Sequence, residues 1–302
     1  MDIYSSIANG PLPVLADGAM GSLLLNRIKR DDERWRGCYP CCEILNLTAP
    51  ETVTSIHADY IRAGARLIRS NSFCGSPPML DRFGLAGSSP DLNHRAARIA
   101  CDARDRYASH GEVWVAGVVG PVIVDGAVQQ DVEASYGEQV RSLLSGGVDL
   151  ILIETAVSMD QVRNALSALR SLPDGKGVPA WVSISAGMAS LAFDQVVEVC
   201  RTYQVSLLGV NCGSGPESFG SDLASLTQYY DGPLYCSPSA GIPDSTGAAA
   251  RYPINAGKFV TEFAALLQSY RILVAGGCCG TTPEYIAEMQ TLQSGAIGKL
   301  RP

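Results

Sequence analysis

Positive charge is scarce in this sequence, and lysine is the scarcest of the charged residues. The 302 residues include 23 Lys and Arg against 30 Asp and Glu, which gives a net charge of −7. Nucleic-acid binding needs clustered Lys and Arg, so the composition argues against a nucleic-acid partner. A barrel lyase or aldolase would need a catalytic lysine, but Lys29, Lys176, Lys258 and Lys299 do not end any of the apolar runs that predict strands.

Long hydrophobic runs are also missing. The longest apolar run, residues 113–124, contains Gly117, Gly120 and Pro121 and is shorter than the ~20 residues that cross a bilayer as a helix. Residues 1–10 lack both the basic start and the apolar stretch of an export signal. We therefore expect a cytoplasmic protein without a membrane partner.

Cysteine, in contrast, is abundant, with ten residues. In a long chain without an export signal, reduced thiols or metal ligands fit this number better than disulfides do. Cys38, Cys41 and Cys42 form one cluster. This cluster has two interpretations, a metal site or loop thiols without a metal, and no second cysteine pair at finger-like spacing accompanies it.

Short apolar runs alternate with helical patterns along the chain. Most of the runs are continuous in Val, Ile and Leu, as expected of parallel strands that are buried on both faces. The eight predicted strands are residues 14–17, 66–72, 113–119, 150–154, 180–185, 207–211, 234–237 and 272–275. Helical stripes lie between them, and Thr48-Ala49-Pro50-Glu51 predicts a capping box at the start of one helix.

Eight strand–helix units predict an α/β fold, a (β/α)8 TIM barrel, as a single domain over residues 1–302. The segment 18–47 is too long for a plain strand–helix loop and predicts an insertion near the barrel mouth. The alternative is a doubly wound open sheet. That fold would need a G-x-G-x-x-G fingerprint after the first strand, which the sequence lacks.

Polar and sulfur-containing side chains follow the carboxyl ends of several predicted strands, where barrel enzymes gather their active sites. They are Asp17, Asn71, Glu154, Cys212 and the pair Cys278-Cys279. Three thiolates select zinc over magnesium or calcium, and a catalytic zinc site keeps one position open.

Glycines flank the cysteine pair and would let both sulfurs face one point. Gly276 and Gly277 precede the pair and Gly280 follows it, so the backbone can curl there. The spacing alone leaves a second interpretation open, a glycine-rich phosphate loop with two buried thiols.

Motifs along the chain resemble the homocysteine S-methyltransferase family, which includes betaine–homocysteine methyltransferase and the homocysteine-binding domain of cobalamin-dependent methionine synthase. The resemblance runs from residue 13 to about residue 290, in the order that the family has. It lies in Asp17-Gly18-Ala19-Met20-Gly21, Leu45-Asn46-Leu47-Thr48 with Pro50-Glu51, Gly120-Pro121, Ile153-Glu154-Thr155, Val210-Asn211-Cys212 and residues 276–284, Gly-Gly-Cys-Cys-Gly-Thr-Thr-Pro-Glu.

The resemblance implies roles for particular residues. Cys212, Cys278 and Cys279 would be zinc (Zn2+) ligands and the catalytic centre, with the homocysteine thiolate in the fourth position. Asp17 and Glu154 would hold the α-ammonium group of homocysteine, although two carboxylates at a barrel rim also fit a general acid/base pair. Gly18 and neighbouring amides would receive the substrate carboxylate, and Asn71 is placed with the substrate-binding residues.

The implied function is zinc-dependent transfer of a methyl group from a small donor to the thiolate of homocysteine, giving methionine. The partners are then homocysteine and a donor such as betaine, S-methylmethionine, S-adenosylmethionine or a dimethylsulfonio compound, unless a separate corrinoid protein delivers the methyl group. The chain is too short for the folate and cobalamin domains of a methionine synthase. The alternative function is a catalytically inactive zinc-binding barrel that acts as a scaffold or regulator.

The sequence departs from the family pattern at three places. One is the loop after the fifth predicted strand, residues 186–192, which is short and lacks much of the polar sequence of relatives. The chain also has Pro238-Ser239-Ala240-Gly241 where many relatives have Pro-Asn-Ala-Gly, and Arg69 where others have an uncharged or acidic residue. A buried Arg69 would need a partner such as Asp17 or Glu154. Alternatively, its planar fork would receive the carboxylate of a zwitterionic donor. The sequence does not predict the oligomeric state.

Overall fold

The structure, a computed structural model, describes residues 13–108, 111–123, 129–187, 191–244 and 250–296. Residues 1–10, which lack an export signal by sequence, lie outside the described residues. So does the carboxyl-terminal segment 297–302 of the predicted domain.

Eight parallel strands form one sheet in the order β1-β8-β7-β6-β5-β4-β3-β2. An isolated bridge between Ala16 and Leu67 joins β1 to β2 and brings the two ends of the sheet together. The predicted (β/α)8 TIM barrel is therefore confirmed. The strands are β1 (Val14–Leu15), β2 (Leu67–Arg69), β3 (Trp114–Val119), β4 (Leu150–Ala156), β5 (Ala180–Ser185), β6 (Leu207–Cys212), β7 (Leu234–Pro238) and β8 (Ile272–Ala275).

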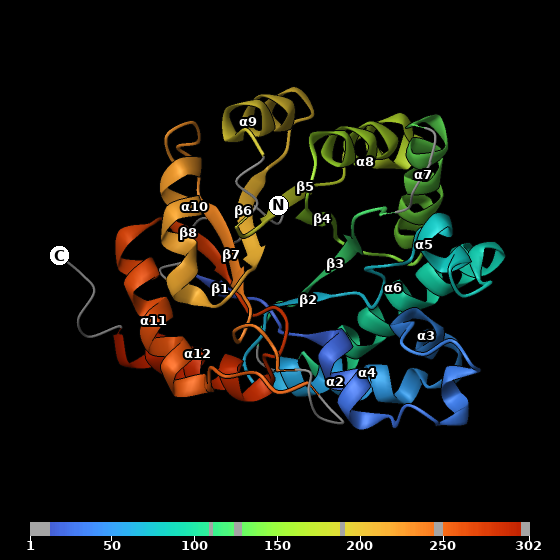
Figure 1. The fold of residues 1–302 in the computed structure, drawn as a ribbon, viewed down its shortest axis with the longest axis horizontal. Helices are drawn as coiled ribbons and strands as arrows, with labels where there is room; N and C mark the ends of the chain where they lie inside the picture. Colours follow the sequence, from blue (N-terminus) through green and yellow to red (C-terminus); the bar gives the residue numbers. More distant parts are fainter. Residues whose placement is uncertain (1–12, 109–110, 124–128, 188–190, 245–249, 297–302) are drawn as a thin grey trace.

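Helices surround the strands (Figure 1). The α-helices are α2 (Met20–Arg27), α3 (Leu45–Thr48), α4 (Pro50–Arg62), α5 (Pro77–Asp81), α6 (Ser89–Tyr107), α7 (Gln129–Ser145), α8 (Met159–Ser171), α9 (Phe193–Thr202), α10 (Phe219–Leu226), α11 (Ala256–Ser269) and α12 (Pro283–Ala296). Short 3-10 helices are η1 (Glu33–Trp35), η2 (Cys42–Ile44), η3 (Ala86–Ser88), η4 (Pro173–Gly175) and η5 (Pro216–Ser218). None of the described helices combines the length and the apolar character that crossing a membrane requires.

Helix α8 shows how the sequence specifies these elements. The Ser158 side chain accepts a hydrogen bond from the backbone N–H of Gln161 and so caps the first turn. Val162, Leu166 and Leu169 recur at helical spacing and are buried against the barrel. The same period that predicted a helix therefore sets which face meets the strands.

The barrel interior is filled by its own set of side chains. Leu150, Trp181, Leu207 and Tyr235 belong to a buried cluster, separate from the larger core between strands and helices. The rings of Trp181 and Tyr235 lie 6.5 Å apart. This packed interior fills the barrel below its carboxyl-terminal rim, the rim where barrel enzymes gather their active sites.

Two local predictions are wrong in detail. The second strand ends at Arg69 rather than at residue 72, because the chain turns so that the N–H of Ser72 bonds the carbonyl of Ser70. The predicted capping box does not form either. Ala49 is the N-cap of α4, while the Thr48 hydroxyl donates to the carbonyls of Arg34 and Ile44. The nearby η1 segment competes for the Thr48 hydroxyl, which a local pattern cannot anticipate.

The segment between β1 and α4 holds α2, η1, η2 and α3. Trp35 and Ile44 anchor it in the main core, where both are almost fully buried. Its last part reaches the rim, since Cys42 and Glu43 line the same cavity as the end of β2.

Candidate metal centre

Three cysteine sulfurs converge at the carboxyl-terminal rim of the barrel. Cys212 ends β6, and Cys278 and Cys279 follow β8. The three Sγ atoms lie within 4.8 Å of one another, and those of Cys278 and Cys279 are 3.9 Å apart. Tetrahedral zinc with Zn–S bonds of about 2.3 Å places sulfurs about 3.8 Å apart, so the spacing fits that ion.

Glycines and a buried threonine shape the loop that carries the cysteine pair. Gly280 has a φ of +79°, which favours glycine. Gly277 is needed for another reason, because a Cβ there would lie 2.3 Å from Thr281 Oγ1. Thr281 in turn donates to the Cys278 carbonyl at 2.7 Å. Close approach at Gly277 and a left-handed turn at Gly280 thus bring the two neighbouring sulfurs to one side.

Polar side chains donate to two of the three sulfurs. The Asn211 amide lies 3.7 Å from Cys278 Sγ, and the Ser239 hydroxyl lies 3.7 Å from Cys212 Sγ. Both donors are buried, at 0% and 1% exposure. Partners of this kind fix the orientation of metal ligands. The sequence analysis noted Ser239 only as a departure from the family pattern and did not predict this contact with Cys212.

The backbone is strained at and beside the three-cysteine group. Cys212 has a φ of +71°, and Thr155 at the end of β4 has a φ of +60°. Positive φ is an outlier for a β-branched residue such as Thr155. A reciprocal pair holds this conformation: Thr155 N–H donates to Asn211 Oδ1, and the Asn211 amide donates to Thr155 Oγ1. Strain that is held by such contacts clusters at functional sites.

The three thiols share their protons unequally. Hydrogen bonds from Cys278 and then Cys279 lower the pKa of the Cys212 thiol. The same bond to Cys212 holds the pKa of Cys278 well above its usual range. The hydrogen bonds within the group therefore favour the thiolate form at Cys212 over Cys278 and Cys279. A soft cation fits this set of three sulfur donors, because it can take the place of the protons that the sulfurs share.

The sulfurs open into a cavity of about 410 Å³. Gly18, Asn71, Glu154 and the three cysteines all line it, so the structure brings together six of the seven predicted site residues. Asp17 is the exception: it does not line the cavity and is 1% exposed. The predicted roles of these residues in substrate binding stay predictions.

Arg69 pairs with both acidic residues. Its Nε atom lies 2.6 Å from Asp17 Oδ1, and a terminal nitrogen lies 2.6 Å from Glu154 Oε1. Of the two interpretations of Arg69, the structure therefore confirms the buried ion pair. Burial raises the pKa of Asp17, and the charge of Arg69 opposes that rise.

Asn71 and Gly18 have structural contacts that their motifs did not predict. The Asn71 amide donates to the Cys42 carbonyl at 2.8 Å and to Asn46 Oδ1 at 2.9 Å, which ties the end of β2 to the inserted segment. A Cβ at Gly18 would lie 2.5 Å from Thr281 Oγ1. Glycine at this position lets the loop after β1 pack against the loop that carries the cysteines.

The second cysteine cluster does not form a comparable group within the described residues. Cys41 lies 3.6 Å from Glu43 Oε2, and burial raises the pKa of both this thiol and the Cys42 thiol. Among the described side chains, loop thiols without a metal are therefore the better interpretation.

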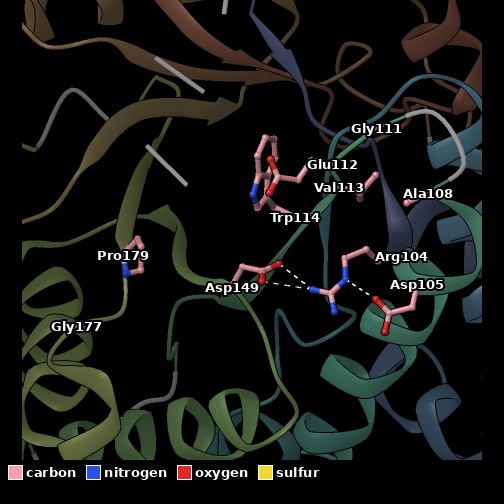
Figure 2. Close-up of a pocket in the computed structure, with 10 residues that line it drawn as sticks. All are labelled: Arg104, Asp105, Ala108, Gly111, Glu112, Val113, Trp114, Asp149, Gly177 and Pro179. Carbon is pink, nitrogen blue, oxygen red and sulfur yellow. Dashed lines mark hydrogen bonds and ion pairs between the residues drawn. The ribbon is translucent and has the colours of Figure 1, made fainter. Parts of the chain in front are cut away.

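A larger cavity, of about 710 Å³, lies at the opposite end of the barrel. It is lined by residues just before or at the starts of β3, β4 and β5, among them Trp114, Asp149 and Pro179 (Figure 2). Arg104 joins Asp149 at 3.1 Å and Asp105 at 2.8 Å across it. None of the predicted site residues lies there, so size does not identify the active site.

A family model described as homocysteine S-methyltransferase matches residues 14–292, most of the chain. The chain belongs to the homocysteine S-methyltransferase family. The resemblance that its motifs carry is thus confirmed. Within the described residues, the three cysteines at its barrel rim form a group that could hold a metal ion.

Among solved structures, the metallated form of the homocysteine methyltransferase MmuM from Escherichia coli is similar to this chain. The identity is 25% with a TM-score of 0.76, and the match covers 95% of this chain and 98% of that one. Among curated relatives, the methionine synthases of Mycobacterium leprae and Mycobacterium tuberculosis are each 29% identical over 91% of this chain. The chain spans only about a quarter of these relatives, 24% of each.

Proposed function

We propose that this homocysteine S-methyltransferase moves a methyl group from a small-molecule donor to the sulfur of homocysteine and releases methionine, in the cytoplasm and without a nucleic-acid or membrane partner. The observation that carries the proposal is the convergence of Cys212, Cys278 and Cys279 at one side of the 410 Å³ cavity. A three-thiolate site leaves one tetrahedral position for a substrate sulfur.

Zinc bound to these thiolates would keep the homocysteine sulfur in its thiolate form at neutral pH. The chain's own residues supply position. Asn211 and Ser239 orient two of the sulfurs through hydrogen bonds, and the Asn211–Thr155 pair fixes the backbone beside them. The acidic cluster of Asp17 and Glu154 is the proposed site of the α-ammonium group. Gly18 and the amides beside it are proposed to receive the carboxylate, with Asn71 in the wall.

The methyl transfer itself needs alignment more than proton transfer. The homocysteine sulfur attacks the methyl carbon and forms the new S–C bond, while the donor's nitrogen or sulfur leaves with the bonding electrons. Cavity walls such as Phe73, Val118 and Met20 exclude water from this step. Holding two reactants in line can lower the barrier by about 7–11 kcal/mol.

A methionine-formation assay tests the proposal. Zinc-loaded protein is incubated with homocysteine and, separately, with betaine, S-methylmethionine, S-adenosylmethionine, dimethylsulfoniopropionate or methylcobalamin. We expect methionine with at least one free donor and none after chelation of the metal. Homocysteine binding without methionine formation from any donor would instead favour the inactive zinc-binding scaffold.

A further inference from the structure

Arg69 is buried beneath the cavity and is 6% exposed. It is the last residue of β2, and its guanidinium reaches β4, β7 and the segments that follow β1 and β8. A buried charge in this position costs free energy unless every donor finds an acceptor.

Every N–H of the guanidinium has an acceptor. Nε bonds Asp17 Oδ1, and one terminal nitrogen bonds Glu154 Oε1 at 2.6 Å and the Tyr235 hydroxyl at 3.3 Å. The other terminal nitrogen bonds the carbonyls of Gly18 at 2.9 Å and Gly277 at 2.6 Å. An arginine has five such N–H groups. Arg69 therefore has no donor left for the carboxylate of a zwitterionic methyl donor.

The two carboxylates are not equivalent. Arg69 takes both oxygens of Asp17, through Nε at 2.6 Å and its own backbone N–H at 2.8 Å. Asp17 does not line the cavity. Glu154 lines it, and within the described part of the chain only its Oε1 atom takes a hydrogen bond. Only Glu154 therefore offers a free carboxylate oxygen to a ligand.

We propose that Arg69 is a positioning residue that divides the two acidic residues between two tasks. Asp17 is the internal counter-ion that fixes Arg69. Glu154, oriented by Arg69, alone contacts the α-ammonium group of homocysteine through Oε2. The same guanidinium braces the metal loop at Gly277, one residue before Cys278. This inference rests on the proposed function and deepens it, because it assigns amino-group recognition to one carboxylate instead of two.

The test compares homocysteine with 4-mercaptobutanoate, which has the same thiol and carboxylate but no amino group. Both affinities are measured by calorimetry on zinc-loaded protein, and the readout is their ratio. A general loss of stability or of zinc weakens the binding of both ligands equally. A change in the ratio of the two affinities therefore reports only on the contact with the ammonium group. Glu154→Gln should lower the ratio by about 10- to 150-fold, the size of a hydrogen bond between charged groups.

Asp17→Asn is the deciding variant. Its ratio should change by no more than about threefold, because Asp17 acts through Arg69 and makes no bond to the ligand. A fall as large as that of Glu154→Gln would overturn the inference. Glu43→Gln is the matched control, since Glu43 is another buried acid of the same cavity and its oxygens are held by Cys74 N–H and Cys41. It should keep the wild-type ratio.

The double variant Arg69→Met with Asp17→Asn tests the positioning role. The double variant removes both charges of a buried pair, so it should destabilise the protein less than Arg69→Met alone, which leaves Asp17 as an unpaired buried charge. The ratio should fall by about three- to tenfold, because Glu154 keeps its charge but loses the bond that orients it. A wild-type ratio would show that Arg69 does not position Glu154. Wild-type protein that binds zinc but neither thiol would refute the proposed function itself, a separate outcome.

Discussion

Cysteine occurs in two kinds of environment in this chain. Cys212, Cys278 and Cys279 face one another at the rim, where hydrogen bonds between them favour a thiolate at Cys212. Cys200 lies on the buried face of α9, where burial raises the pKa of its thiol to about 12. A thiol of that kind stays protonated at neutral pH and behaves as a small apolar side chain.

The difference predicts which cysteines hold metal. Purified wild-type protein should carry about one zinc per chain, and Cys278→Ala should lose it together with methionine formation, because two remaining thiolates hold zinc poorly. Cys42→Ala is the matched control, since Cys42 lines the same cavity outside the three-sulfur group. It should retain its zinc. Metal analysis by mass spectrometry decides, and full zinc content in Cys278→Ala would exclude these ligands.

His57 is a buried group with no chemical task in the proposed reaction. It lies in α4, is fully buried, and neither ring nitrogen has a hydrogen-bond partner among the described residues. Burial lowers its pKa to about 4. The unfolded chain, with an ordinary histidine pKa near 6.5, therefore binds more protons than the folded protein below that pH.

Stability should fall as the pH drops from about 6.5 toward 4, the window between the two pKa values. The His57 share of this loss is about 2–3 kcal/mol at pH 4.5. His57→Leu should remove that share, so urea titrations at pH 7 and pH 4.5 should differ less for the variant than for wild type. An equal pH dependence of the two proteins would mean that folding does not lower the pKa of His57.

At the scale of elements, the close pairing of β6 and β7 sets where Cys212 lies. Gly209 in β6 is the partner of Tyr235 in β7, and a Cβ at Gly209 would lie 1.8 Å from the Tyr235 carbonyl oxygen. The same register continues to the pair Cys212–Pro238, next to Ser239. A bulkier residue at 209 would have to push the two strands apart and move the metal ligand with them.

We expect Gly209→Ala to destabilise the protein by about 3 kcal/mol, the upper range for overpacking a core, and to weaken zinc binding. Gly137 is the matched control. It lies inside α7, and nothing lies within 4 Å of a Cβ built there. Gly137→Ala should therefore stabilise the protein by about 1 kcal/mol through helix propensity. Denaturant unfolding measures both, and a Gly209→Ala protein as stable as wild type would refute the close contact.

At the scale of the molecule, the barrel closes without help from the metal. The bridge between Ala16 and Leu67 and the bonds from Arg66 N–H to Leu15 and from Asp17 N–H to Leu67 join the first and second strands. The three thiols lie above this closure, at the ends of β6 and β8.

Chelation of zinc should therefore leave the circular dichroism spectrum unchanged. The melting temperature should fall by roughly 5 °C, because a ligand that binds only the folded state stabilises it by mass action. Readdition of zinc should restore it. Loss of the helical signal on chelation would show that the metal holds the fold together.

The sequence alone predicted the barrel, the rim and the grouping of the three cysteines. Strands and helices bury side chains at regular spacings along the chain, so continuous apolar runs and helical stripes can be recognised in the sequence itself. The (β/α)8 rule then places the ends of all strands at one rim, so Cys212, Cys278 and Cys279 could be brought together without coordinates. The end of β2 was predicted wrongly because the chain turns there and Ser72 N–H bonds the Ser70 carbonyl. The first turn of α4 was predicted wrongly because the Thr48 hydroxyl bonds the carbonyl of Arg34, which is distant in the sequence.

Only the tertiary structure decided how the charges and sulfurs are partnered. Arg69 could have bound a donor or paired with an acid, and the choice depends on acceptors in β4, in β7 and in the segments after β1 and β8, which no local pattern relates. The contact of Ser239 with Cys212 is of the same kind. Hydrogen bonds are short and directional, so their partners follow from three-dimensional positions within a fraction of an ångström. A burial pattern involves many residues on one face of a helix or strand, so it can be recognised in the sequence. A single hydrogen-bonded pair between distant residues cannot.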